Sequence, residues 1–175
     1  MRAVVDIGSN SVKFTIAEIQ RSVPVVVKKK SWVTRLGKGL EKTGLLASES
    51  VAETEKALTE IARELAPFRP GLELHAVATS AVRDCKNPQE IQSRVQRILN
   101  VPLRILTGLE EARYSLLGAS AAAQSLFGTK QCIFIDVGGA STEVGIVEPS
   151  FAAHSFQAGA VRCHEALGLD RMPVK

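Results

Sequence analysis

The 175-residue sequence contains few aromatic residues and few cysteines. Aromatic side chains make up 5% of the chain, which leaves little material for stacking on single-stranded nucleic acid. The three cysteines, Cys85, Cys132 and Cys163, are scattered and form no C-x-x-C pair. That spacing argues against a disulfide framework or a zinc site. We therefore expect reduced thiols and no specific nucleic-acid partner.

The sequence also lacks a long apolar segment. No run of about 18 apolar residues is present, so we expect no membrane-spanning helix and no membrane partner. Asp6, Asn10 and Lys13 interrupt the opening residues, which is unlike a secretory signal peptide. These absences predict a cytoplasmic protein, and the hydrophobic content of 45% is typical of a globular one.

Positive charge is present in excess and is unevenly spread. The formal net charge is +4, and residues 1–45 hold nine Lys or Arg against three acidic residues. A basic region of this kind steers acidic partners. The triplet Lys28–Lys30 has an alternative interpretation as the solvated end of a strand.

Apolar periodicity predicts strands interspersed with helices, and therefore an α/β fold. We expect one helix to be capped by Ser48 or Ser50 and a second to be capped by Asn87, with Pro88 at its first position. A third helix is expected from Glu110 to about Leu126. The expected strands cover residues 2–6, 12–19, 23–28, 72–78, 103–106, 132–136, 142–148 and 151–156.

An internal repeat appears when the sequence is shifted by 130 residues. Residues 4–18 read VVDIGSNSVKFTIAE and residues 134–148 read FIDVGGASTEVGIVE. Such a repeat predicts two related domains, which we place at residues 1–129 and 130–175, each opening with a strand–turn–strand hairpin. The identical positions are 6/136, 8/138, 11/141, 16/146 and 18/148.

The turn of each hairpin has the composition of an anion-binding loop. Glycine lets backbone N–H groups approach an anion without a Cβ in the way, and hydroxyl and amide side chains add donors. Asp6 and Asp136 stand where a carboxylate can hold a cation or a water beside that anion. Two ordinary hairpin turns are the alternative, but two copies in phase favour a pair of loops that clamp a phosphate chain. The predicted phosphate-binding residues are Gly8, Ser9, Asn10, Ser11, Gly138, Gly139, Ser141 and Thr142.

Two motifs, Asp-Ile-Gly-Ser-Asn-Ser (6–11) and Asp-Val-Gly-Gly-Ala-Ser-Thr-Glu (136–143), resemble those of the exopolyphosphatase and guanosine pentaphosphate phosphohydrolase (Ppx/GppA) family. Further similar segments are 34–40, 78–83, 106–113 and 159–162, so the resemblance runs along the whole chain. It implies the actin-like (ribonuclease H-like) α/β fold of the ATPase, sugar-kinase and Hsp70 superfamily, with domain I followed by the opening strands of domain II.

The resemblance also implies a role for individual residues. Glu111 is expected to be the base that activates a water, and Arg83 to neutralise charge on the transferred phosphoryl group. Asp136 and Glu143 are expected to hold Mg²⁺, with Asp6 as a further candidate ligand. Glu110 is the better candidate for an ordinary helix-start glutamate. Arg35 is expected to support a basic channel.

Two departures from the family pattern are visible. Ala140 replaces a glycine in the second loop, which is tolerable unless that residue needs a positive φ. Leu109 stands where a polar residue is common. The family also implies a longer protein, so we expect the chain to be a fragment whose second sheet is left partly uncovered, and the complete protein to be a homodimer.

The sequence leaves three functions open. The first is a phosphohydrolase that releases terminal phosphate from polyphosphate or guanosine pentaphosphate with Mg²⁺. The second is a module that binds polyphosphate or the guanosine alarmone without turnover. The third is an ATP-dependent kinase of the same superfamily, against which the segments 78–83 and 110–113 argue.

Overall fold

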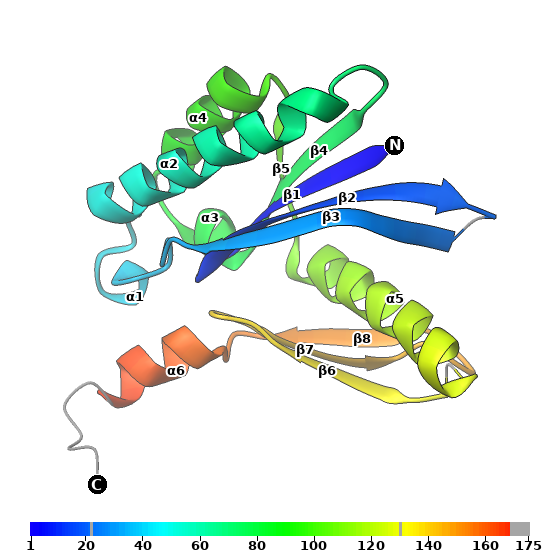
Figure 1. Ribbon diagram of the computed structural model, residues 1–175. Coiled ribbons are helices and arrows are strands. Elements are labelled where there is room, and N and C mark those ends of the chain that lie inside the picture. The colour runs from blue at the N-terminus through cyan, green and yellow to red at the C-terminus, as the bar shows by residue number, and fades with distance from the viewer. Residues whose placement is uncertain (22, 130, 169–175) are drawn as a thin grey trace, which may run out of the picture. The chain divides into compact units, whose positions relative to one another are not determined.

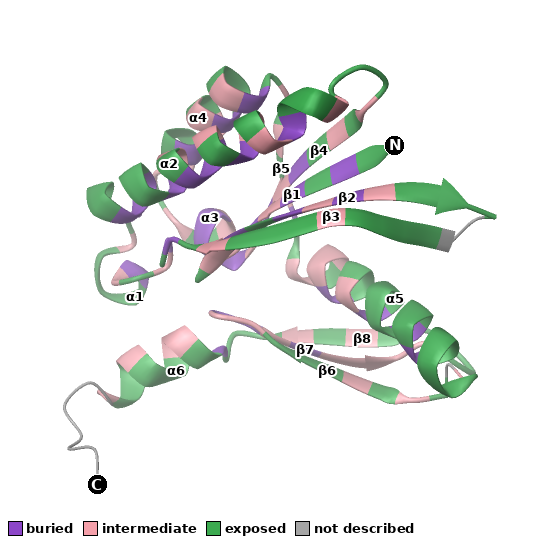
Figure 2. Cartoon of the chain, viewed as in Figure 1, coloured by how far each residue is buried: buried purple, intermediate pink, exposed green. Residues whose placement is uncertain are grey.

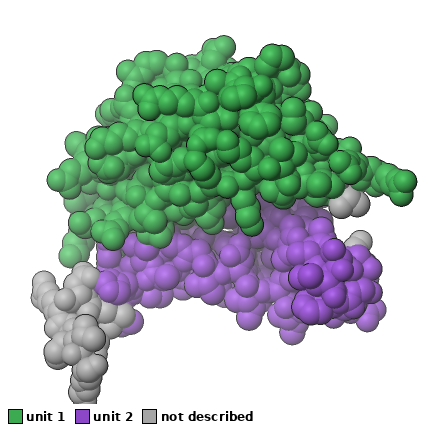
Figure 3. Space-filling view, viewed as in Figure 1, with its two compact units in different colours: residues 1–105 green, residues 106–175 purple. Residues whose placement is uncertain are grey.

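The computed structural model describes residues 1–21, 23–129 and 131–168. It contains two compact units, residues 1–105 and residues 106–175 (Figure 3). By packing, helix α5 (Gly108–Phe127) therefore belongs with the second unit. The predicted domain boundary between residues 129 and 130 was placed from the sequence repeat, and it stays a prediction.

The first unit is built on a five-stranded sheet with the order β3-β2-β1-β4-β5 (Figure 1). β2 is antiparallel to β1 and β3, whereas β4 is parallel to β1 and β5 is parallel to β4. This mixed sheet confirms the α/β prediction. The strands are β1 (Arg2–Ile7), β2 (Ser11–Gln20), β3 (Val23–Val33), β4 (Glu73–Ala78) and β5 (Leu103–Ile105).

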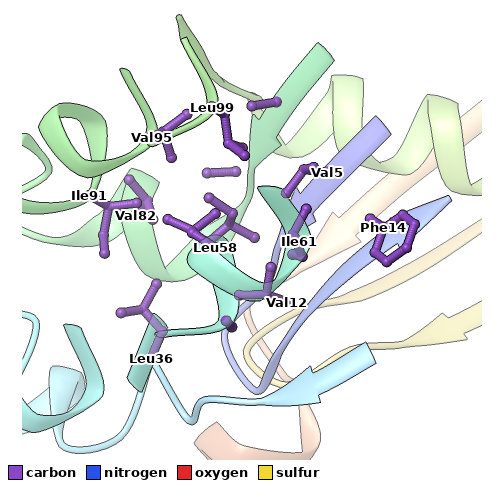
Figure 4. Packing of buried hydrophobic residues seen from close by; sticks show 14 of the residues in the cluster. Val5, Val12, Phe14, Leu36, Leu58, Ile61, Val82, Ile91, Val95 and Leu99 are labelled. Carbon is purple, nitrogen blue, oxygen red and sulfur yellow. The ribbon is translucent and has the colours of Figure 1, made fainter. Parts of the chain in front are cut away.

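Helices cover one face of this sheet and form the core with it. Alternate residues of β1 and β2 point to that face, and their apolar side chains are buried (Figure 2). They pack against the apolar stripes of α2 and α4, from which Leu58, Ile61 and Val95 contribute (Figure 4). The helical elements of the unit are α1 (Leu40–Thr43), α2 (Ser48–Leu65), η1 (Ala66–Phe68), α3 (Ser80–Asp84) and α4 (Gln89–Leu99).

Two predicted helix caps are wrong. The N-cap of α2 is Ala47, so Ser48 is already the first helical residue and Ser50 lies inside the helix, where it is buried. The N-cap of α4 is Pro88. Asn87 instead uses its side-chain amide in the preceding loop, where Oδ1 accepts from Leu46 N at 2.8 Å and Nδ2 donates to Leu46 O at 3.3 Å. The side chain of Asn87, which was expected to cap α4, therefore hydrogen-bonds to the backbone of Leu46 instead.

The basic triplet of β3 is divided between the two faces of the sheet. Lys28 and Lys30 both form ion pairs with Glu64 of α2. The hydrogen bonds that Lys28 and Lys30 donate within these ion pairs lower the pKa of Glu64 to about 2. Two of the three lysines therefore fasten the third strand to a helix, which favours the structural interpretation of the triplet.

The second unit is a three-stranded antiparallel sheet, with the order β6-β7-β8, that packs on α5. Gly145 allows this close packing, because a Cβ there would lie 2.3 Å from Leu116 Cδ2 of the helix and 2.3 Å from Ala152 O of β8. The elements are β6 (Ile133–Val137), β7 (Thr142–Ile146), β8 (Ala152–Phe156) and α6 (Ala160–Leu167).

The sheet face opposite α5 in the second unit carries exposed apolar side chains. Ile133, Ile135 and Val137 of β6 lie on it and are all exposed. Val144 of β7 is the register partner of Ile135, and Phe156 of β8 is the register partner of Thr142 on the same face. Within the described residues, no helix combines the length and the apolar character needed to cross a bilayer.

Candidate functional site

The two predicted loops share one turn geometry. Gly8 N donates to Ser11 O at 3.0 Å, and Gly138 N donates to Ser141 O at 2.9 Å. A Cβ at either glycine would lie 3.1 Å from the carbonyl oxygen that closes its turn, which is closer than most Cβ atoms come to an oxygen. The repeat seen in the sequence therefore corresponds to a repeated backbone conformation.

Residues 34–37, which we call the first bracing segment, hydrogen-bond to the backbone of the first loop. Gly37 N donates to Ser9 O at 2.8 Å, and Thr34 N and Arg35 N donate to Asn10 O at 3.1 and 3.0 Å. The N–H and C=O of a trans peptide point in opposite directions. The N–H of Asn10 shares its peptide with the bound carbonyl of Ser9, so it points away from the bracing segment. It has the orientation that an anion-binding donor needs.

The hydroxyl of Ser9 lies inside the first unit. Its Oγ is 2.9 Å from Ser80 Oγ, and both residues are buried. Since Ser80 begins α3, this contact ties the first loop to the helix that carries Arg83. The Arg83 guanidinium is half-buried and forms an ion pair with Asp84, with 3.4 Å between Nε and Oδ1.

Asp6 lies on β1 directly before the first loop and is half-buried. Its register partner on β2 is Lys13, so a cationic side chain already stands across the ladder from this predicted metal ligand. Asn10 at the tip of the turn is exposed, and Ser11 is half-buried.

The second loop is held in the same manner by residues 158–162, the second bracing segment. Ala160 N donates to Gly138 O at 2.9 Å, and Val161 N donates to Gly139 O at 2.7 Å. The N–H groups of Gly139 and Ala140 share peptides with these carbonyls, so they point away from the bracing segment. The Thr142 hydroxyl donates to the carbonyl of Ala158, which also belongs to the bracing segment.

The packing of the second loop explains why Ala140 is tolerated there. Ala140 is not among the residues with positive φ, so its methyl group meets no backbone strain. The tight position is Gly159, where a Cβ would lie 2.5 Å from Ala140 N and from Gly139 C. Leu109, the other departure from the family pattern, is exposed and meets no packing constraint.

Two carboxylates face each other across the hairpin of the second unit. Asp136 and Glu143 are register partners on β6 and β7. Glu143 is 2% exposed, and burial raises the pKa of its carboxyl, as do the negative charges of Glu111 and Asp136. Hydrogen bonds from Ser155 and Ser141 oppose that rise in pKa. A cation at this position would relieve the mutual repulsion of the carboxylates.

Glu111 lies in the first turn of α5, on the unit that contains the second loop. It is half-buried, and the buried Ser141 places Oγ 3.4 Å from Glu111 Oε1, at the long limit for a hydrogen bond. The neighbouring Glu110 serves as the capping glutamate: its Oε2 accepts from Thr107 N at 2.9 Å, while Glu110 N donates to Thr107 Oγ1 at 3.2 Å. Glu110 thus has the helix-start role that was predicted for it.

The oxygen donors of the second unit fit Mg²⁺, although they do not form a complete protein cage. Among the described residues, no three His, Cys, Asp or Glu side chains converge as a metal-binding group. Mg²⁺ commonly keeps several waters and takes one or two carboxylates together with phosphate oxygens from a substrate. Asp136 and Glu143 supply two carboxylates of this kind from adjacent strands.

Several residues that shape the two loops carry no role in the sequence analysis. Ser80, Ser115 and Ser155 hydrogen-bond to Ser9, Asp136 and Glu143 respectively. Ser115 and Ser155 give no periodic or motif signal, so the sequence offered no means of finding them. Ser80 lies in the segment 78–83 that resembles the family, but its contact with Ser9 required coordinates. Gly159 did lie in a segment that resembles the family, but its packing against the second loop required coordinates.

Comparison with known sequences assigns most of the chain to one family. The model of the Ppx/GppA phosphatase family matches residues 15–175. The chain is 34% identical over 173 residues to exopolyphosphatase 2 of Mycobacterium tuberculosis, covering 93% of this chain and 53% of that protein. It is 32% identical over 142 residues to the guanosine-5'-triphosphate,3'-diphosphate pyrophosphatase of Pseudoalteromonas atlantica, covering 81% of this chain and 27% of that one. The chain thus spans about half the length of the first relative and less of the second.

Solved structures agree with the sequence relatives. An exopolyphosphatase-like protein superposes with a TM-score of 0.84 at 32% identity, covering 94% of this chain and 52% of that one. The Ppx/GppA member from Aquifex aeolicus gives 0.75 at 31% identity, covering 94% and 53%. An exopolyphosphatase from Cytophaga hutchinsonii shares the fold with a TM-score of 0.82 at 23% identity, covering 99% and 54%. These likenesses confirm the predicted α/β fold as the one that solved members of the family have, and with the family match they show that the chain belongs to the Ppx/GppA phosphatase family.

Proposed function

We propose that this chain carries catalytic residues of a Mg²⁺-dependent phosphohydrolase that releases terminal phosphate from inorganic polyphosphate or guanosine pentaphosphate. The observation that carries the proposal is the grouping in the second unit: Glu111 beside Ser141, and Asp136 opposite Glu143, around a turn with outward N–H groups. Relatives named exopolyphosphatase and guanosine-5'-triphosphate,3'-diphosphate pyrophosphatase support the substrate class.

The proposed reaction is an in-line displacement at the terminal phosphorus. The oxygen of a water attacks that phosphorus, and the bond between the phosphorus and the bridging oxygen breaks. The products are orthophosphate and a phosphate chain that is one unit shorter. Glu111 accepts the proton that the attacking water loses. When bound, Mg²⁺ neutralises negative charge on the phosphoryl oxygens.

The loops and the arginine have binding roles in this proposal. The outward N–H groups of Asn10, Gly139 and Ala140 donate to phosphate oxygens, and no side chain needs to be charged for them to do so. Arg83 stabilises the charge that develops on the transferred phosphoryl group. Asp136 and Glu143 hold the cation, with Asp6 as the remaining candidate.

A pair of adjacent glutamates provides the test of the base assignment. We expect Glu111→Gln to lower phosphate release by about 100- to 10,000-fold, the usual contribution of a general base. Glu110→Gln is the matched control: it makes the same change of charge one residue away, and glutamine still completes a capping box. We expect its rate to stay within about threefold of the unchanged protein, because the cap is kept and any weakening of it affects stability more than chemistry.

The assay is the release of orthophosphate, with Mg²⁺, from polyphosphate, guanosine pentaphosphate and ATP by the full product of the gene that encodes this chain. Loss of release in Glu111→Gln alone supports the proposal, and the ranking of substrates decides the preferred one. If both variants keep the full rate, Glu111 is not the base. If polyphosphate binds but no substrate is hydrolysed, the protein is a binding module.

A further inference from the structure

Each carboxylate assigned to the cation receives a hydroxyl hydrogen bond from a different neighbouring element. Ser115 Oγ of α5 donates to Asp136 Oδ2 at 2.8 Å. Ser155 Oγ of β8 donates to Glu143 Oε1 at 2.8 Å. Both bonds have the length of well-formed O–H···O hydrogen bonds. The two carboxylates are thus each bonded by a serine of a neighbouring element, one on the helix and one on the third strand.

We propose that Ser115 and Ser155 are positioning residues, which fix the carboxylates of Asp136 and Glu143 in the orientation that binds a divalent cation. The inference rests on the proposed function, because that function assigns the cation to these two carboxylates. Each serine engages one oxygen of its carboxylate, Oδ2 of Asp136 and Oε1 of Glu143.

The need for such residues follows from the position of the two carboxylates. They are register partners on adjacent strands, so two negative charges stand opposite each other. Without a hydrogen-bond donor, each side chain would rotate away from the other to reduce repulsion. A hydroxyl bond stabilises one rotamer, in the way that groups behind metal ligands commonly orient them.

The surroundings restrict both serines. Ser155 lies close to the N-terminal end of α5, where a Cβ at Gly108 would be 3.4 Å from both Ser155 Cβ and Oγ. Ser115 lies on the same helix, and Leu116 beside it packs on Gly145 of β7 without an intervening side chain. The helix therefore brings Ser115 to Asp136 by packing that does not involve the carboxylate.

The sequence repeat supplies a matched control for Ser155. In the first unit, Ser31 of β3 is the register partner of Lys13, as Ser155 of β8 is the register partner of Glu143. Since a lysine occupies the position of Glu143, Ser31 has no carboxylate to orient there. Ser125, an exposed residue of α5, is the corresponding control for Ser115.

The experiment measures Mn²⁺ binding to the substrate-free protein by electron paramagnetic resonance, with thermal unfolding recorded on the same samples. We expect Ser115→Ala and Ser155→Ala each to weaken Mn²⁺ binding by about tenfold, the lower end for groups that support metal ligands. Ser31→Ala and Ser125→Ala should leave Mn²⁺ affinity unchanged. Ser115→Thr, which keeps the hydroxyl, should restore it.

Three results would overturn the positioning role or its basis. If the alanine variants bind Mn²⁺ as tightly as the unchanged protein while Glu143→Gln does not, the serines do not position the ligands. If affinity falls only in proportion to lost thermal stability, their role is structural. If the unchanged protein hydrolyses substrate with Mg²⁺ but Glu143→Gln binds Mn²⁺ normally, the cation assignment fails while the proposed hydrolase stands.

Discussion

The two hairpins of this chain have the same turn and the same strand register, yet they are covered on opposite faces. In the first copy, Val5 and Ile7 are completely buried under α2 and α4. Their counterparts in the second copy, Ile135 and Val137, are 66% and 62% exposed. A repeat in sequence therefore fixes the backbone of each hairpin, whereas burial depends on which neighbouring elements pack on it.

One residue shows how the second copy accepts its helix. Thr15 of the first copy corresponds to Gly145 of the second. Gly145 faces α5, where Leu116 leaves no room for a Cβ. A similar difference affects charge: Lys13 faces Asp6 in the first copy, but Glu143 faces Asp136 in the second. The second copy thus concentrates the negative charge that a cation needs.

The largest difference in stability should separate alanine substitutions of two isoleucines at matching positions of the repeat, Ile16 and Ile146. We expect Ile16→Ala to destabilise the protein by about 2–5 kcal/mol, because it leaves a cavity in a filled core. Ile146→Ala should cost less than about 1 kcal/mol, since Ile146 is only half-buried on the open face. Urea unfolding of the two variants checks this difference, and equal losses would show that the two faces are equally covered.

A smaller effect is expected from Gly145→Ala. The added methyl collides with Ala152 O and Leu116 Cδ2, so we expect a destabilisation of about 1–3 kcal/mol, as for other overpacked sites. Thr15→Ala at the corresponding position of the first copy is the control and should change stability far less. A thermal melt measures both variants. An unchanged melting temperature for Gly145→Ala would mean that α5 does not pack closely on β7.

The smallest effect concerns the ion pairs that fasten β3 to α2. Hydrogen bonds from Lys28 and Lys30 lower the pKa of Glu64 to about 2, compared with 4.5 in the unfolded chain. A lowered folded-state pKa contributes stability above pH 4.5, and that stability is lost as the pH falls toward 2. Urea midpoints of Glu64→Gln should therefore depend less on pH in this window than those of the unchanged protein. High salt should reduce the difference, because the side chains of Lys28, Lys30 and Glu64 are partly exposed and salt screens such charges.

Much of the fold could be predicted because its signals are local. The alternation of apolar residues in β1 and β2, and the glycine turns at Gly8 and Gly138, depend on residues close in sequence. The cap of α4 could not be predicted, because Asn87 bonds to Leu46 across 41 positions. Residue types alone do not reveal such long-range competition for a polar side chain.

The candidate site divides in the same way. Asp136 could be found from the strand–turn–strand pattern that repeats, because Asp6 stands at the matching position. Glu143 was expected only from the resemblance to the family, because its counterpart in the first copy is Lys13. Whether Ser115 of α5 reaches the carboxylate of Asp136 depends on how closely α5 packs on the sheet. Gly145 allows the close packing, because it has no Cβ to collide with Leu116 of the helix. Ser115 and Ser155 therefore required the structure.

The two bracing segments have a consequence for how an anion would be selected. They turn carbonyl oxygens of Ser9, Asn10, Gly138 and Gly139 inward before any ligand arrives. Little conformational entropy is then lost on binding, and the preference for negative charge resides in the orientation of peptide dipoles. Peptide groups do not titrate, so this part of the selectivity is independent of pH.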